Sequence, residues 1–151
     1  MSDTDTPKLA ELEVLLAKQE ISELLYKYCH ACDRSDEEVL RNCFHPDSTH
    51  DHAGFVGKSE DWIIGALEWL KGRQAVSHMV TNILIQVEDR HAFSDCHFLA
   101  YNRALKTSGN GWEDFFVKGR YLDRFEKREG YWKILHRKGV HDLEQTFDVP
   151  N

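Results

Sequence analysis

The sequence has no long apolar run, no basic cluster and no recognisable leader. A membrane-spanning helix needs about 20 consecutive apolar residues, and the longest apolar stretches of this chain are far shorter. Lys and Arg are scattered and the net charge at pH 7 is -7, which argues against a nucleic-acid-binding or anionic-membrane surface. The first residues, MSDTDTPK, lack the basic and apolar regions of a secretory signal. We therefore expect a cytoplasmic protein that binds neither nucleic acid nor membranes.

Several motifs of common enzyme classes are also missing. The chain contains no Gly-rich phosphate loop, no dinucleotide fingerprint and no G-x-S-x-G elbow. Cys29 and Cys32 have the C-x-x-C spacing, but they lie near the end of a helical pattern, whereas a redox pair begins a helix after a strand. No second pair of ligands has the spacing of a zinc site. The four cysteines are expected to be buried or half-buried free thiols.

The composition is that of an ordinary globular domain. The chain has 151 residues, of which 41% are hydrophobic and 30% are charged. This length is sufficient for one domain with a proper core. We find no internal repeat, low-complexity segment or linker, and we expect a single domain over residues 1–151, with residues 1–6 disordered.

Apolar residues at spacings of three and four predict three helices in the first half of the chain. Their expected ranges are Pro7 to about Ala31, Ser35 to about Cys43, and Ser59 to Lys71. Ser35 with Glu38 three residues later matches a capping box, so Asp33 is not needed as a helix cap. A turn at 45–47, a short strand at 48–52 and a hairpin-like connection at 53–57 are expected between the second and third helices.

The second half of the chain reads as four long strands separated by turns. They are expected at Ser77–Glu88, Ala92–Thr107, Trp112–Lys127 and Tyr131–Asp142. Helices come first and a meander of antiparallel strands follows, without βαβ alternation. The sequence therefore predicts an α+β fold, with helices packed on one face of a curved antiparallel sheet.

Six short motifs occur in a familiar order along most of the chain. They are Tyr28…Asp33, Phe44…Asp47, Gly57, His78-x-x-x-Asn82, Gly119-Arg120-Tyr121-x-Asp123-x-Phe125 and Glu129-Gly130-Tyr131-Trp132-Lys133-Ile134. Together they resemble the SnoaL-like group of the nuclear transport factor 2-like superfamily. This resemblance implies a cone-shaped fold in which the N-terminal helices cover the concave face of the sheet and enclose a deep apolar pocket.

The resemblance leaves the function open, because this superfamily hosts many activities. It includes scytalone dehydratase, a dehydrochlorinase, ketosteroid isomerases, polyketide cyclases and cofactor-free lyases of lignin-derived diarylpropanes. It also includes small subunits of ring-hydroxylating dioxygenases and non-catalytic binding modules.

Asp33 and His78 lie where the dehydratase and dehydrochlorinase branch carries an Asp–His dyad. A carboxylate that accepts a hydrogen bond from one ring nitrogen fixes the imidazole tautomer and stabilises the imidazolium that forms later. In an apolar cavity such a pair makes a general base. The alternatives are a core histidine bonded to the backbone and a solvated loop carboxylate.

Nine histidines are a high count for this length, and several could bind the substrate. His50 lies where the same branch has a pocket-lining aromatic residue. His136 is expected on the same strand face as Ile134 and Trp132. His97 shares a face with Tyr101, which is either the pocket face or the outer face.

Tyr28 and Tyr101 are further candidates for the pocket, as is Arg103, while His30 is a weaker one. His45, His91 and His141 are expected in turns or at the surface. His50 and His52 have H-x-H spacing, which could bind a metal, but the related enzymes need none, so we expect neither metal nor cofactor.

The leading hypothesis is a cofactor-free lyase or dehydratase that acts on a small aromatic or hydrophobic molecule, such as a lignin-derived diaryl compound. His78 would remove a proton, and a small neutral fragment would leave. The alternatives are an isomerase or polyketide-type cyclase with the same dyad, and a non-catalytic ligand-binding or oxygenase small-subunit role. A homodimer or homotrimer is expected from the resemblance.

Overall fold

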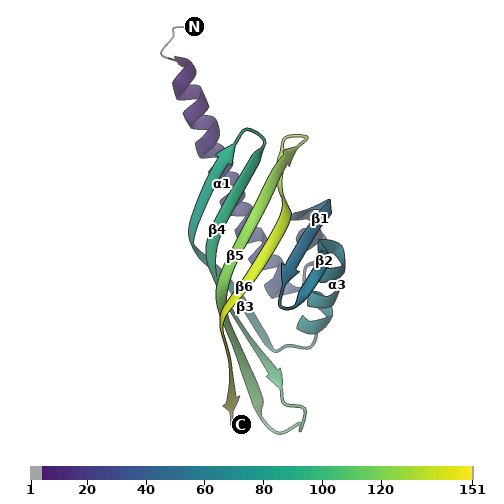
Figure 1. The fold of residues 1–151 in the computed structure, drawn as a ribbon. Helices are drawn as coiled ribbons and strands as arrows, with labels where there is room; N and C mark the ends of the chain where they lie inside the picture. Colours follow the sequence, from purple (N-terminus) through teal and green to yellow (C-terminus); the bar gives the residue numbers. More distant parts are fainter. Residues whose placement is uncertain (1–4, 151) are drawn as a thin grey trace.

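Three helices and one mixed six-stranded sheet make up the computed structural model, which describes residues 5–150 (Figure 1). The helices are α1 (Asp5–Arg34), α2 (Glu37–Asn42) and α3 (Ser59–Leu70). The strands are β1 (Phe44–His52), β2 (Phe55–Lys58), β3 (Ala75–Glu88), β4 (His91–Leu105), β5 (Trp112–Arg128) and β6 (Tyr131–Val149). The predicted α+β class is confirmed, and α1 and α3 lie on one face of the curved sheet (Figure 1). Within the segment 1–6, residues 5 and 6 begin α1, and residues 1–4 lie outside the described part.

The strand order in the sheet is β2-β1-β6-β5-β4-β3. The four long strands form the antiparallel meander that the sequence predicts. The turn expected at 45–47 is instead part of β1, which runs parallel to β6. Residues 53–57 form a tight hairpin, since Ala53 and Gly54 both have positive φ and β2 starts at Phe55. The parallel pairing of β1 with β6 has no local sequence signal, because its partners are far apart in the chain.

Bulges shift the register of the long strands at three places. In β3 the extra residue lies between Thr81 and Leu84, where Asn82 has a φ of 53°. In β6 the ladder skips Leu135 and, further on, Asp142. Each extra residue reverses which side chains face the helices, because side chains alternate along a strand.

The first bulge in β6 makes one sequence expectation wrong. Ile134 and Arg137, three residues apart, are both fully buried against the helices, and His136 points to the opposite face. His136 Nδ1 there lies 2.7 Å from the Thr49 hydroxyl. His136 therefore does not share a face with Ile134, because Leu135 is inserted between them.

A buried ion pair lies at the centre of the core. Arg137 donates hydrogen bonds to both carboxylate oxygens of Asp123, at 2.8 and 2.7 Å, and neither side chain is exposed to solvent. The guanidinium lies 4.0 Å from the ring centroids of both Tyr28 and Tyr121, whose rings contact each other edge to face. The bidentate geometry and the two aromatic faces compensate for the loss of hydration.

The connection from α1 to α2 differs from the predicted capping box. Ser35 has a positive φ and ends α1, while the Asp36 side chain accepts a hydrogen bond from the Val39 backbone and caps α2. The inference about Asp33 still holds, since its carboxylate caps neither helix.

The cysteines are buried free thiols, as expected. Burial raises the pKa of Cys29 and Cys32 to about 12, so both remain protonated and unreactive near neutral pH.

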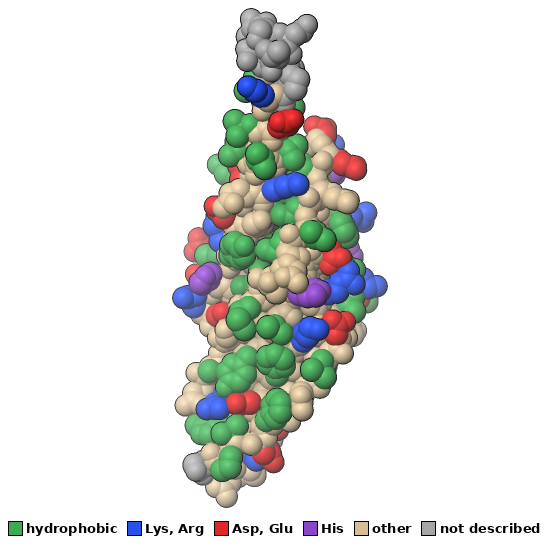
Figure 2. Space-filling model, turned by 90° about the vertical axis from the view of Figure 1, so that its left-hand side faces the viewer, with side chains coloured by type: hydrophobic (Ala, Val, Ile, Leu, Met, Phe, Trp, Pro, Cys, Tyr) green, Lys and Arg blue, Asp and Glu red, His purple; other side chains and the backbone are tan. Residues whose placement is uncertain are grey.

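Apolar side chains are also exposed on the outside of the molecule. Figure 2 shows such side chains on one face of the molecule, interspersed with charged groups. Leu15, Leu84 and Phe93 are among the exposed apolar residues of the protein. No described helix is both long and apolar enough to cross a membrane. The homodimer or homotrimer stays a prediction.

Candidate active site

The Asp33 and His78 side chains meet although 45 residues separate them in the chain. Asp33 lies in the last turn of α1, and His78 lies near the start of β3. Asp33 Oδ1 accepts a hydrogen bond from the His78 backbone N–H at 2.8 Å and lies 2.8 Å from His78 Nδ1. An ionised carboxylate can only accept, so Nδ1 carries the proton and Nε2 of the neutral ring has the free lone pair.

His78 lines a cavity of about 500 Å³ between the helices and the inner face of the sheet. This volume lies in the range of small-molecule sites. Aromatic rings supply much of the wall, from Trp62 and Trp69 of α3 and from Phe98 and Phe115 of the sheet. The cavity can therefore bind a flat apolar molecule next to the dyad.

A second carboxylate–imidazole pair lies in the same cavity. His141 Nδ1 is 2.5 Å from Glu144 Oε1, and His141 Nε2 is 2.8 Å from His52 Nε2. All three residues line the cavity. Burial, and to a lesser extent the neighbouring His141, lower the pKa of His52 to about 3, so His52 is neutral at physiological pH.

Three further polar side chains line the cavity. Asn102 is buried, and its Oδ1 accepts a hydrogen bond from Arg73 Nη1 at 2.7 Å, which leaves the amide N–H groups for a ligand. Tyr28 lines the cavity as the sequence suggests, together with Tyr121. Burial raises the pKa of both tyrosines, so both phenols are neutral groups that can donate hydrogen bonds.

His50 lies inside the protein but behind the cavity wall. Its ring stacks on Trp62 with centroids 4.0 Å apart, and neither ring nitrogen has a hydrogen-bond partner. Burial, followed by the charge of Arg137, lowers the pKa of His50 to about 2. On β1 the residue that lines the cavity is therefore His52, the next inward residue, because Trp62 covers His50.

His97 and Tyr101 lie on the outer face of β4. The inner positions of this strand are the intervening residues, among them Phe98 and Ala100, which line the cavity. His136 points outward as well, for the reason given above. These three candidates do not reach the cavity, and Arg103, also at an outer position, pairs with Asp114.

His141 is the functional candidate that the sequence interpretation misplaced. We expect it in a turn or at the surface from the sequence, but the extra residue Leu135 in β6 turns it into the cavity. Of the other histidines, His30 contacts Arg34 on α1 and His45 contacts the Glu126 carbonyl. The H-x-H spacing of His50 and His52 could have drawn attention to this end of the site, but nothing in the local sequence identifies His141 as the partner of His52.

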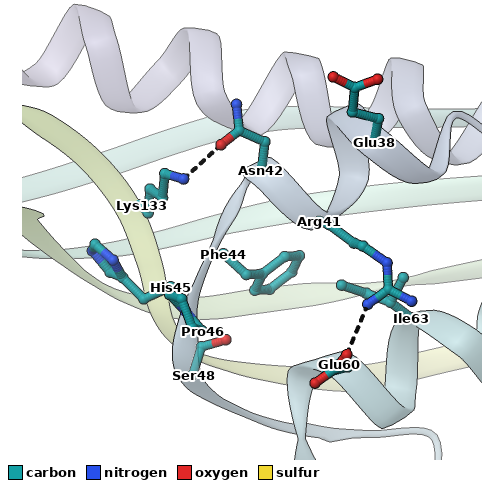
Figure 3. A pocket seen from close by; sticks show the side chains of 10 residues that line it. All are labelled: Glu38, Arg41, Asn42, Phe44, His45, Pro46, Ser48, Glu60, Ile63 and Lys133. Atoms are coloured by element: carbon teal, nitrogen blue, oxygen red, sulfur yellow. Dashed lines mark hydrogen bonds and ion pairs between the residues drawn. The ribbon is translucent and has the colours of Figure 1, made fainter.

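A second cavity of about 520 Å³ opens between α2, α3 and the start of β1 (Figure 3). Its polar groups are mostly paired with protein groups. Arg41 contacts Glu60 at 3.3 Å, and Lys133 donates to Asn42 at 2.5 Å. This cavity is separate from the dyad and offers no comparable acid–base pair. Among residues 5–150, no three His, Cys, Asp or Glu side chains are grouped as metal ligands.

A helix-covered curved sheet that encloses an internal cavity defines a protein of the nuclear transport factor 2-like superfamily. The family described as the SnoaL-like domain matches residues 13–138, and the chain belongs to this family.

Solved structures agree with this assignment. A protein from Novosphingobium aromaticivorans, provisionally assigned as a scytalone dehydratase, is 24% identical with a TM-score of 0.77, over 89% of this chain and 90% of that one. The hexachlorocyclohexane dehydrochlorinase LinA-type3 from Novosphingobium barchaimii is 18% identical with a TM-score of 0.77, over 91% and 94%. An NTF2-like protein from Novosphingobium aromaticivorans is 22% identical with a TM-score of 0.71, over 94% and 92%. No curated protein sequence matches the chain. At these identities the structures establish a shared fold and leave the substrate open.

Proposed function

We propose that the protein is a cofactor-free lyase or dehydratase that acts on a small aromatic or hydrophobic molecule. The observation that carries this proposal is the pairing of Asp33 with both the backbone N–H and the ring of His78 at the wall of an aromatic-lined cavity. The two contacts fix the ring of His78 relative to β3 and determine its tautomer. This arrangement suits a general base.

In the proposed reaction, His78 Nε2 removes a proton from a carbon of the bound molecule. The electron pair of the broken C–H bond forms a double bond while the bond from the adjacent carbon to oxygen or halogen breaks; the electron pair of that bond stays on the leaving atom, which gains a proton and departs as water or a halide acid. Loss of a small aldehyde would instead begin with removal of a hydroxyl proton by His78, after which a C–C bond breaks and its electron pair stays on the larger fragment. The charge that develops on the imidazole is stabilised by Asp33, which remains ionised. Asn102 and the tyrosines offer neutral donors for a carbonyl or phenolic oxygen of the substrate.

The cavity also suggests the substrate class. Its walls are rich in aromatic rings, and its volume suits a drug-sized molecule. A diaryl compound of the kind derived from lignin meets these requirements. The dehydratase and the dehydrochlorinase among the similar structures are consistent with elimination chemistry.

A mass-spectrometric screen tests the proposal. The purified protein is incubated, without added cofactor or metal, with pooled aromatic alcohols, diaryl compounds, halogenated rings and steroid enones. Asp33→Asn and His78→Gln should each lower turnover about 100-fold to 10,000-fold. His91→Gln, at an exposed histidine outside the cavity, is the matched control and should retain full turnover.

The mass of the product separates the alternatives. Loss of a small neutral mass that depends on both Asp33 and His78 supports a lyase. Turnover at unchanged mass, with the same dependence, would instead indicate an isomerase or cyclase. Full activity in both dyad variants would contradict the assigned roles, and the absence of turnover with every pool would favour a binding role.

A further inference from the structure

The cavity contains a second imidazole that is held by a carboxylate, on the same inner face of the sheet as His78 but three strands away. We propose that His141, positioned by Glu144, is the general acid of this site and protonates an oxygen leaving group. The substrate class is then a carbonyl compound with an alkoxy, aryloxy or hydroxyl group on the β carbon. This inference rests on the proposed function, because it requires His78 to act as the base.

The sheet register places the two pairs at opposite ends of one row of residues. His78 of β3 pairs with Ala100 of β4, Ala100 pairs with Val117 of β5, and Val117 pairs with Glu144 of β6. Three strand intervals correspond to roughly 14 Å along a flat sheet, and the curvature shortens the direct path. Ala100 and Val117 line the cavity between the two ends and are small enough to leave room for a substrate.

The bulge at Asp142 brings His141 and Glu144 to the same face. Residues three apart normally point to opposite faces of a strand, because side chains alternate. Here Gly119 faces His141 while Lys118 faces Leu143, so Asp142 is skipped in the ladder. Glu144 can therefore contact the ring nitrogen of His141 at 2.5 Å. The pair is a consequence of a specific irregularity in the strand.

His52 completes the arrangement as a neutral neighbour. In the proposed acid role, His141 donates from Nδ1 to Glu144 and from Nε2 to His52 Nε2, and the distances of 2.5 and 2.8 Å between these atoms allow both hydrogen bonds. A substrate oxygen that binds beside His52 can replace it as the acceptor of the second hydrogen bond. The Glu144 side chain is 54% exposed, so protons can return to His141 from solvent along this side.

The proposed step balances in atoms and charge. His78 Nε2 takes the proton from the carbon next to the carbonyl, and that electron pair becomes the new C=C bond. The bond between the β carbon and the leaving oxygen breaks, and its electron pair stays on the oxygen, which takes the proton from His141 Nε2. The alcohol, phenol or water leaves neutral, with His78 as imidazolium and His141 as neutral imidazole. Solvent exchange returns both rings to their starting states.

The dependence on the leaving group tests this role. Two β-aryloxy ketones serve as probes, one that releases phenol and one that releases nitrophenol, which leaves readily without a proton. Release is followed by absorbance, and exchange of the α-hydrogen with deuterated water is followed by NMR on the same samples. The variants are His141→Gln, Glu144→Gln and His78→Gln, with Glu88→Gln as the control for an exposed carboxylate on another strand.

We expect His141→Gln to lower kcat for release of phenol by about 100-fold or more, with a much smaller effect on release of nitrophenol and on deuterium exchange. Glu144→Gln should show the same selectivity to a lesser degree, and its conservative change at an exposed position keeps the test valid if His141→Gln folds poorly. Equal losses for both leaving groups, or no loss for either, would overturn the role of His141.

The two readouts also separate this inference from the proposed function. Deuterium exchange that requires His78, without release of either phenol, would overturn the acid at His141 and leave the base at His78 supported. The absence of both exchange and release in the unmodified protein would overturn the base, and the acid with it.

Discussion

Stability at acidic pH should depend on two buried histidines. Burial lowers the pKa of His50 to about 2 and that of His52 to about 3, whereas an unfolded chain binds protons at the ordinary histidine pKa of about 6.5. As the pH falls below about 6.5, the unfolded state takes up protons that the native state does not, so the free energy of unfolding decreases. The loss approaches about 1.4 kcal/mol per pH unit for each histidine and amounts to about 2 kcal/mol each between pH 7 and pH 5.

His50→Phe isolates one of these contributions. Phenylalanine keeps a flat ring against Trp62 and removes two ring nitrogens that have no hydrogen-bond partner. Its larger ring can add some strain, but that cost is independent of pH. Urea unfolding of both proteins at several pH values between about 7 and 5 should therefore show a shallower pH dependence for the variant, by about 2 kcal/mol across this range.

His91→Gln serves as the control, because His91 is exposed on the outside of the sheet. It should leave the pH dependence close to that of the unmodified protein. Parallel curves for His50→Phe and the unmodified protein would refute the reasoning, since they would mean that His50 binds its proton equally well in the native state.

The remaining predictions concern the scaffold. Arg137→Met should lower the free energy of unfolding by about 3–5 kcal/mol by leaving Asp123 charged and unpaired, and adding Asp123→Leu should recover much of this loss in chemical denaturation. Gly139→Ala should destabilise the protein by about 1–3 kcal/mol, because the added methyl group would collide with the ring of His52. Gly65→Ala, where the methyl group enters open space beside α3, should instead raise the free energy of unfolding by up to about 1 kcal/mol, measured by thermal unfolding. Asp36→Ala should cost about 1 kcal/mol through loss of the α2 cap, measured by urea unfolding.

Much of the fold follows from local patterns in the sequence. Helical periodicity gives α1 and α3, and short turns, two of which contain glycine, separate the four long strands. The proximity of Asp33 and His78 was inferred from a family resemblance, since no periodicity relates residues 45 apart. α1 ends at Arg34 and β6 at Val149, beyond the predicted ends at Ala31 and Asp142. Sequence patterns do not predict these ends, because the boundaries of helices and strands depend on tertiary contacts beyond the apolar residues.

The end of the cavity that is lined by His52, His141 and Glu144 shows why the other site residues could not be predicted. Strict alternation from Ile134 would turn His136 inward and His141 outward, which matches the roles the sequence suggested. The extra residue Leu135 reverses this order, and the extra residue Asp142 then brings Glu144 to the same side as His141. A change of one residue in register exchanges every inward and outward side chain beyond it. The β6 side chains that line the cavity are therefore set by two bulges whose positions depend on pairing with β5, and that pairing is a tertiary property.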